Sequence, residues 1–283
     1  MKYLILGSSG QIGAALVEYL QSLGHTVLLF DIAHAPQEDL RIYHNKLLRT
    51  YMKQADFVFF LAFDVGGSRY LKKYQYTFEF LSNNVKIMNT TFDMLRRYKR
   101  KFIFASSQMS NMLYSSYGIL KALGEKHTHV LGGLVVKFWN VYGIEKDLEK
   151  AHVITDFVLK AKNKSVIDMM TDGTEERQFL YSNDACEALH ILSEKYDSIS
   201  RDKELHVTSF EWENILQVAK IIASHFKGTK IKPSLNKDDV QKFKRNEPDP
   251  YILEHWRPKT SLEEGIKKIV EYYHRFLDLN YKK

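Results

Sequence analysis

The chain has 283 residues, 45% of them hydrophobic and 27% charged, so it can bury a full core and is not expected to be disordered. Its net charge of +7 is spread over short clusters with no pattern of a nucleic-acid-binding module, although it favours an anionic, phosphorylated substrate. No run is long enough for a membrane span, and no set of metal ligands is predicted. The single cysteine, Cys186, favours a reducing compartment, so we expect a cytoplasmic protein.

The start of the chain follows the order strand, glycine turn, helix, strand, acid. An apolar strand over 3–6 leads into Gly7–Gly13 (GSSGQIG), and an amphipathic helix over about 12–23 follows. A second strand over 25–30 ends at Asp31. This order is typical of a dinucleotide-binding unit, and the alternative is a glycine-rich turn without a ligand.

Each residue of this turn has a distinct expected task. Gly7 allows a sharp turn, Gly10 allows the backbone to approach a pyrophosphate, and Gly13 allows the helix to pack on the strand. The helix N-terminus attracts phosphates. Asp31 can accept from ribose hydroxyls and would repel a 2′-phosphate, which favours NAD over NADP. The expected cofactor contacts here are Gly7, Gly10, Gln11, Ile12, Gly13 and Asp31.

Residues 56–62 (DFVFFLA) lack strand alternation and predict a parallel strand buried on both faces. Leu61 and Ala62 lie at its carboxyl end, where a small side chain leaves room for the cofactor, so both are expected to contact it. Gly66 and Gly67 follow in a loop that permits close backbone approach to a ligand.

The strongest catalytic candidate lies in residues 101–126, where a buried strand ends in Ser107 and a helix carries Tyr117 and Lys121. The spacing of i and i+4 places the last two on one helix face. A phenol can exchange a proton, an ammonium lowers the phenol's pKa, and a hydroxyl can hold the reacting oxygen. The alternative for Tyr117 is a half-buried aromatic in a chain with 17 tyrosines.

A second Tyr-x-x-x-Lys pair, Tyr142 and Lys146, runs into Gly143 and suits a loop. The rest of the chain predicts alternating elements, with a polar stretch over 35–56 and Asn183-Asp184 as a helix N-cap. Further helices are expected over about 70–99, 152–163, 183–195, 211–226 and 261–277, and a further strand over 134–138.

These elements predict an α/β fold, a Rossmann-type doubly wound parallel sheet with a smaller mixed C-terminal substrate lobe. We expect an NAD-binding domain over 1–144, to which some later segments return, and a mainly substrate-binding lobe over 145–283.

With these residues in hand, the chain resembles the extended short-chain dehydrogenase/reductase superfamily, specifically its NAD-dependent nucleotide-sugar epimerase/dehydratase group. The matching motifs run nearly end to end. They are Gly7–Gly13, Asp31, 56–62, Asn84, Phe104–Ser107 (FASS), Tyr117–Lys121 (YGILK) with Glu125, Asn140–Gly143 (NVYG), Arg177–Asp184 (RQFLYSND) and Trp256–Gly265 (WRPKTSLEEG).

The resemblance implies hydride transfer from a sugar carbon, usually C4, to NAD. It makes Tyr117 the acid/base, Lys121 the residue that binds the nicotinamide ribose and lowers the Tyr117 pKa, and Ser107 the residue that binds the sugar hydroxyl. Asn140 and Arg177 would contact the nucleotide or its phosphates, unless Asn140 caps a loop and Arg177 pairs with a neighbouring glutamate. The expected substrate contacts are Gly66, Gly67, Ser107, Asn140 and Arg177.

Four departures narrow this expectation. Gln108 and Met109 stand where the 4,6-dehydratases carry Asp-Glu, so elimination by that route is not expected. No cysteine stands near Ser107, although GDP-sugar 3,5-epimerases and fucose-synthase-type enzymes carry one near this position. Phe60 replaces the family's histidine, which we interpret as a packing change. The loop between Ser107 and Tyr117 is about half the usual length.

We therefore expect an NAD-dependent nucleotide-sugar 4-epimerase with a 4-keto intermediate, and Leu61–Gly67 favours a GDP-sugar. A C4 dehydrogenase or ketoreductase is the first alternative, and a non-catalytic dinucleotide-binding sensor or scaffold is the second. Intact Ser107, Tyr117 and Lys121 argue against the sensor. The resemblance also implies a homodimer formed through helices near 72–99 and 115–127.

Overall fold

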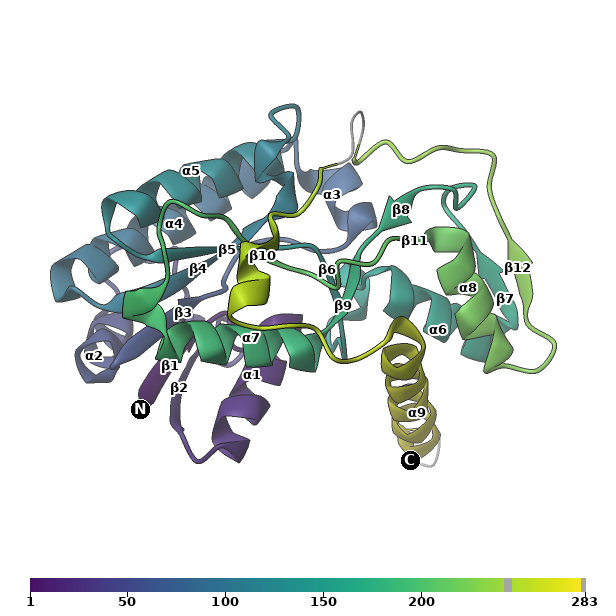
Figure 1. Ribbon diagram of the computed structural model, residues 1–283, viewed down its shortest axis with the longest axis horizontal. Coiled ribbons are helices and arrows are strands. Elements are labelled where there is room, and N and C mark those ends of the chain that lie inside the picture. The colour runs from purple at the N-terminus through teal and green to yellow at the C-terminus, as the bar shows by residue number, and fades with distance from the viewer. Residues whose placement is uncertain (242–245, 281–283) are drawn as a thin grey trace.

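The computed structural model describes residues 1–241 and 246–280 (Figure 1). Its centre is a six-stranded sheet in the order β10-β5-β4-β3-β1-β2, and all of its pairings are parallel. This Rossmann-type arrangement confirms the predicted fold class. The strands are β1 (Lys2–Leu6), β2 (Thr26–Phe30), β3 (Phe57–Phe60), β4 (Lys101–Ser107), β5 (Leu134–Phe138) and β10 (Leu205–Val207).

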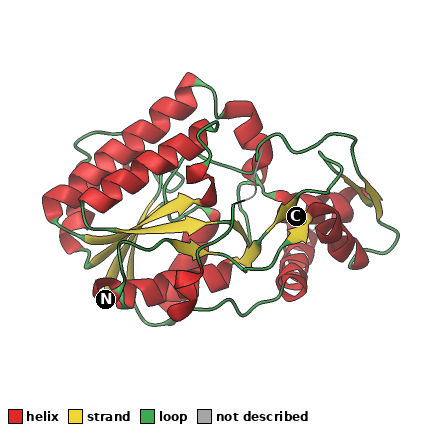
Figure 2. Cartoon of the chain, turned by 45° about the horizontal axis from the view of Figure 1, so that its top comes forward, coloured by secondary structure: helices red, strands yellow, loops and turns green. Residues whose placement is uncertain are grey.

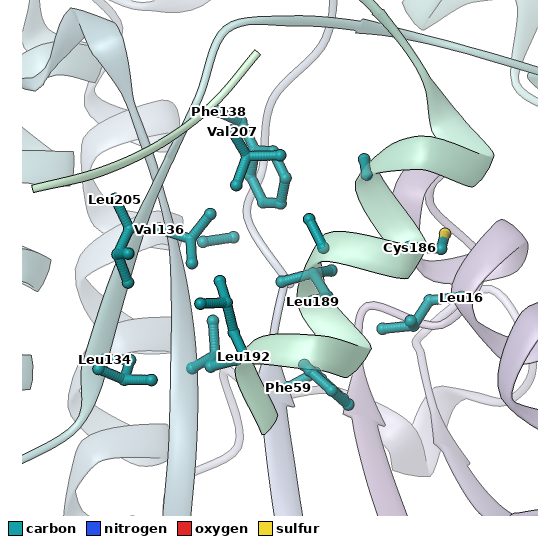
Figure 3. Packing of buried hydrophobic residues seen from close by; sticks show 14 of the residues in the cluster. Leu16, Phe59, Leu134, Val136, Phe138, Cys186, Leu189, Leu192, Leu205 and Val207 are labelled. Atoms are coloured by element: carbon teal, nitrogen blue, oxygen red, sulfur yellow. The ribbon is translucent and has the colours of Figure 1, made fainter. Parts of the chain in front are cut away.

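Helices cover both faces of this sheet (Figure 2). Because strand side chains alternate between faces, Tyr3 and Ile5 of β1 face one helical layer and Leu4 and Leu6 face the other. The first layer holds α1 (Gln11–Ser22) and α7 (Ser182–Glu194), whose Leu16, Cys186, Leu189 and Leu192 pack on the sheet (Figure 3). The second layer holds α2 (Lys46–Gln54), α4 (Phe78–Tyr98) and α5 (Ser116–Val130).

A smaller lobe has its own apolar cluster, built around Phe157, Phe179 and Ile222. It includes α6 (Val153–Lys164), β7 (Val166–Asp168), β8 (Glu176–Arg177), β9 (Phe179–Tyr181), β11 (Glu213–Asn214), α8 (Ile215–Ser224), β12 (Lys230–Lys232) and α9 (Leu262–Asn280). The strand β6 (Asn140–Tyr142) pairs in parallel with β9 and so joins the lobe to the sheet domain. No helix in the described part of the chain is long and apolar enough to cross a membrane.

The structure corrects three local predictions. The polar stretch over 35–56 contains α2, which Asn45 caps by accepting from the Leu48 N–H. The helical region over 70–99 is two helices, α3 (Ser68–Tyr74) and α4, because Thr77 caps a new helix N-terminus. The N-cap of α7 is Tyr181 rather than Asn183-Asp184.

The order of the strands reverses between β1 and β3, since the chain moves outward from β1 to β2 and then returns to the other side. Ligands bind at such a switch point, beyond the carboxyl ends of the strands. The Gly7–Gly13 turn follows β1 and the Leu61–Gly67 loop follows β3, so both lie at this point. Ser107 ends β4, the next strand along the sheet.

Candidate active site

A cavity of about 630 Å³ lies along the carboxyl ends of the parallel strands. The structure brings all the expected site residues except Arg177 into its lining. These are Gly7, Gly10, Gln11, Ile12, Gly13, Asp31, Leu61, Ala62, Gly66, Gly67, Ser107, Tyr117, Lys121 and Asn140.

The glycine turn is as tight as its sequence suggests. Gly7 has a φ of +89°, and a Cβ there would lie 2.7 Å from the Ala62 nitrogen. A Cβ on Gly13 would lie 2.0 Å from the Gly7 carbonyl oxygen, so neither position accepts a side chain without displacement of the backbone. The Gln11 side-chain amide bonds to the backbone on both sides. Its nitrogen donates to the Val141 carbonyl oxygen, and its oxygen accepts from the Gly143 N–H.

The Asp31 carboxylate is fixed at the end of β2 by two backbone donors. It accepts from the N–H groups of Ser9 and Ala33, each over 2.9 Å. The carboxylate therefore stands beside the glycine turn and faces the cavity, which is the position expected for a contact with the adenosine ribose.

Ser107 and Tyr117 meet at the end of β4. Ser107 is 8% exposed, its Oγ accepts from the Met109 N–H over 3.2 Å, and its side chain lines the cavity together with Tyr117. Burial raises the pKa of Tyr117 to about 12, and the Ser107 side chain opposes that rise, so the pKa is raised here and not lowered by Lys121 as expected. Hydroxyl and phenol therefore share one region of the cavity, as binding and protonation of a single oxygen require.

Lys121 lies one helical turn beyond Tyr117 and is 4% exposed. Its Nζ donates to the Ala105 carbonyl oxygen over 2.6 Å and lies 3.8 Å from the centre of the Phe63 ring. Burial lowers its pKa to about 7, and the nearby Glu125 carboxylate opposes that shift. The Lys121 Nζ thus lies 5.7 Å from the centre of the Tyr117 ring, with little solvent around it.

The loop after β3 is held in place by the buried side chain of Asn84. Its Oδ1 accepts from the Asp64 N–H, and its Nδ2 donates to the carbonyl oxygens of Asp64 and Phe80. Gly67 donates its N–H to the Lys150 carbonyl, and a Cβ there would lie 2.6 Å from the Ala151 carbonyl oxygen. Phe60, in the family's histidine position, packs between aromatic rings and confirms the interpretation as a packing change.

Asn140 offers an acceptor to a ligand. Among the described residues, nothing bonds its buried Oδ1, although the residue lines the cavity. A buried acceptor without a partner is costly, so a ligand donor at this point would be favourable.

Arg177 lies outside the cavity lining and forms an ion pair with Asp238 rather than with Glu175 or Glu176. Its only other hydrogen bond among the described residues goes to the Glu176 carbonyl oxygen. Its assigned contact with substrate remains a prediction, and it would require Asp238 to release the guanidinium.

Several lining residues were not expected from the sequence, among them Lys150, Val240 and Gln241. Lys150 belongs to a charged segment that resembles a solvated loop. The other two come from a stretch more than 120 residues beyond Tyr117, and no motif marks them.

A Rossmann-type sheet with Ser107 at the end of β4, and with Tyr117 and Lys121 on the following helix α5, is the arrangement of the extended short-chain dehydrogenase/reductase enzymes. The chain belongs to the NAD-dependent epimerase/dehydratase family, because the model of that family matches residues 3–207. It is therefore an enzyme of this family, and its cofactor is NAD.

The individual proteins that the chain resembles have low sequence identity to it. A UDP-N-acetyl-α-D-glucosaminuronate decarboxylase of Bacillus cytotoxicus is 25% identical over 95% of this chain and 97% of its own length. A GDP-L-fucose synthase of Sinorhizobium fredii is 32% identical over 47% of this chain and 44% of its own length. A solved UDP-glucose 4-epimerase of Thermotoga maritima, with UDP-glucose, superposes with a TM-score of 0.76 at 20% identity, covering 98% of this chain and 100% of that one.

Proposed function

We propose that the protein is a nucleotide-sugar 4-epimerase that acts through a 4-keto intermediate. The observation that carries this proposal is the placement of Ser107, Tyr117 and Lys121 in one cavity with the glycine turn and Asp31. Such a cavity can hold a dinucleotide and a sugar hydroxyl side by side.

The residues of the chain move one proton. Tyr117 must lose its own proton before it can accept that of the C4 hydroxyl, and burial, which raises its pKa, opposes this loss. In the proposed reaction the Lys121 cation offsets that cost by stabilising the phenolate, while Ser107 holds the substrate oxygen. NAD supplies the acceptor for the C4 hydride and returns it. After the keto sugar has rotated in the site, so that its other face meets the cofactor, Tyr117 returns the proton to the oxygen. The cycle therefore has no net redox change.

Two features support simple redox at one carbon. Gln108 and Met109, directly after Ser107, cannot exchange a proton, so elimination of water lacks its acid and base there. Cys186 is fully buried on α7 against the sheet, and burial raises the pKa of its thiol well above the ordinary range. A cysteine-based epimerisation at C3 and C5 therefore has no residue to carry it in the described site.

We propose a GDP-sugar as the first substrate to test. Leu61–Gly67 favours it, and the 32% identical relative, over 47% of this chain, is named for a GDP-sugar. UDP-sugars are the alternative, because a relative that spans nearly the whole chain is named for one.

That same relative supports a second candidate, decarboxylation of a nucleotide-linked uronic acid. Oxidation at C4 would place a ketone β to the C6 carboxylate. The C5–C6 bond would then break, CO2 would leave, and C5 would take up a proton. A C4 dehydrogenase or ketoreductase shares the same first step, and a non-catalytic sensor would retain only the cofactor site.

The deciding experiment begins with mass spectrometry of the molecules released when freshly purified protein is denatured. About one NAD per chain is expected, because an epimerase recycles its cofactor within each turnover. GDP-mannose, UDP-glucose and UDP-glucuronate are then followed by NMR. A C4 epimer without net NADH supports the proposal, CO2 release supports the second candidate, and stoichiometric NADH supports a dehydrogenase.

We also propose a homodimer through α4 and α5. Exposed apolar side chains on and just before these helices supply a candidate contact face, namely Tyr76, Phe78, Leu81, Val85, Leu113, Ile119, Leu123 and Val130. A cytoplasmic location remains a prediction from the single cysteine.

A further inference from the structure

The stretch between Ser107 and Tyr117 lies flat on the sheet domain instead of over the cavity. Met109 and Met112 are buried in the apolar cluster beneath it, and the Ser115 hydroxyl donates to the Gln75 side chain over 2.8 Å. Of residues 108–116, Gln108 and Met109 alone line the cavity. A wall over the sugar end must therefore come from another part of the chain.

Val240 and Gln241 supply part of that wall. They end the segment 235–241, which we name the strap. The strap follows β12 and crosses the molecule from the smaller lobe toward α3 (Figure 1). Asp238 forms an ion pair with Arg177 of β8, and Asp239 Oδ2 lies 2.7 Å from Lys72 Nζ on α3. The strap is thus anchored to both lobes.

The end of the strap enters the cavity wall. Val240 is 6% exposed and belongs to the same apolar cluster as Met109 and Met112. The Asp238 carboxylate accepts from the N–H groups of Val240 and Gln241, over 3.0 and 3.3 Å, and so shapes the turn that places Gln241 at the cavity.

An amide contact then joins the strap to the residue after Ser107. Gln108 Nε2 donates to Gln241 Oε1 over 3.0 Å. Asn246 Nδ2 donates to Gln108 Oε1 over 2.8 Å and to its carbonyl oxygen over 2.7 Å, which sets the orientation of the Gln108 amide. In the part of the chain that the structure describes, Gln241 Nε2 donates to no protein acceptor, so it remains available to a ligand.

We propose that Gln241 is a substrate-contacting residue whose amide nitrogen donates to an oxygen substituent of the sugar, next to the carbon that reacts at Ser107 and Tyr117. This rests on the proposed function, since the ligand is a nucleotide sugar. A primary amide binds a hydroxyl or carbonyl oxygen without exchanging protons, so it does not compete with Tyr117. The strap takes the place of the shortened loop and makes recognition of the sugar depend on the C-terminal lobe.

The test is calorimetric titration of the NAD-loaded protein with GDP, GDP-mannose, UDP and UDP-glucose. Gln241→Ala and the length-matched Gln241→Met should weaken binding of the accepted nucleotide sugar roughly 3- to 10-fold, as for one lost hydrogen bond. Binding of the corresponding nucleoside diphosphate, which lacks the sugar, should not change. The matched control is Lys237→Ala, because Lys237 lies in the strap but pairs with Asp172 away from the cavity, and it should bind all ligands like wild type.

Two outcomes overturn the inference. Unchanged binding of the nucleotide sugar by both Gln241 variants would exclude a contact. Equal weakening of the nucleotide sugar and of the diphosphate would show that Gln241 only holds the strap. If the wild-type protein binds none of the four ligands, the proposed function fails before any variant is compared, and the inference fails with it.

Discussion

Lys121 Nζ donates to the carbonyl oxygen of Ala105 over 2.6 Å. Because Ala105 lies two residues before Ser107 on β4, this bond holds the amino group of Lys121 close to the end of that strand. The side chain has three aromatic rings around it, from Phe63, Phe104 and Tyr117, and is 4% exposed. The site therefore keeps a titratable cation where water is scarce, and its charge should depend on pH near neutrality.

This arrangement predicts a pH-dependent stability. Burial lowers the Lys121 pKa from 10.5 to about 7, so between about pH 7 and 10 the unfolded chain binds more protons than the folded one. The free energy of unfolding should then rise with pH across this window, by at most about 1.4 kcal/mol per pH unit. Lys121→Met should lose that rise, as urea denaturation at several pH values would measure. Parallel curves for variant and wild type would contradict the lowered pKa, and the exposed Lys146→Met is the control.

Tyr117→Phe should reduce turnover by about 10² or more, because the acid/base is removed while the ring remains. Retention of NAD should not change. The matched control is Tyr142→Phe in the other Tyr-x-x-x-Lys pair, whose hydroxyl donates over 3.4 Å to the Leu262 carbonyl oxygen and lies outside the cavity lining. The quantity to compare is the single-turnover rate of hydride transfer. Equal rates for the two variants would remove the role assigned to Tyr117.

Asp31→Asn should narrow the preference for NAD over NADP. The variant removes a negative charge beside the 2′ position of the ribose, so NADP should bind roughly tenfold better relative to NAD. Dissociation constants for both dinucleotides on cofactor-free protein measure this ratio. Asp56→Asn is the control, since Asp56 binds the Lys2 N–H at the opposite end of the strands. An unchanged ratio in Asp31→Asn would refute the assignment.

Phe78→Glu should dissociate the proposed dimer. Phe78 begins α4 and is 77% exposed, so a charge there would be buried without a partner in a helix-to-helix contact. Light scattering after size-exclusion chromatography should show a smaller particle than wild type. Leu235→Glu is the control, because Leu235 is 99% exposed in the strap, away from α4 and α5. A monomeric wild type would reject this interface.

Much of the sheet domain could be predicted from the sequence, because most of its strands and turns carry a clear local pattern. Runs such as residues 57–60 are apolar on both faces, and Gly7 and Gly13 admit no Cβ, so pattern and backbone conformation agree. Helix α2 was missed because it buries only Leu48 and Met52 within a polar stretch. Strand β10 was missed because three residues carry too little pattern.

The site, like the fold, has a part that local sequence predicts and a part that it does not. Ser107, Tyr117 and Lys121 lie within fifteen residues, so strand and helix geometry predicts their meeting. The pair Arg177–Asp238 and the contact of Gln108 with Gln241 join residues separated by 61 and 133 positions. Such contacts depend on how the lobe folds back on the sheet, which no local spacing reveals.

Strand β10 has a consequence for synthesis of the chain. This strand, residues 205–207, pairs with β5 only after the ribosome has also made β9 and α7, and the helix-like turn at Pro250–Glu254 contributes Ile252 to the same core still later. The nascent cofactor domain therefore exposes the edge of β5 until then. A stop codon near residue 144 would leave that edge uncovered, and such a fragment should aggregate rather than fold as an independent NAD-binding module.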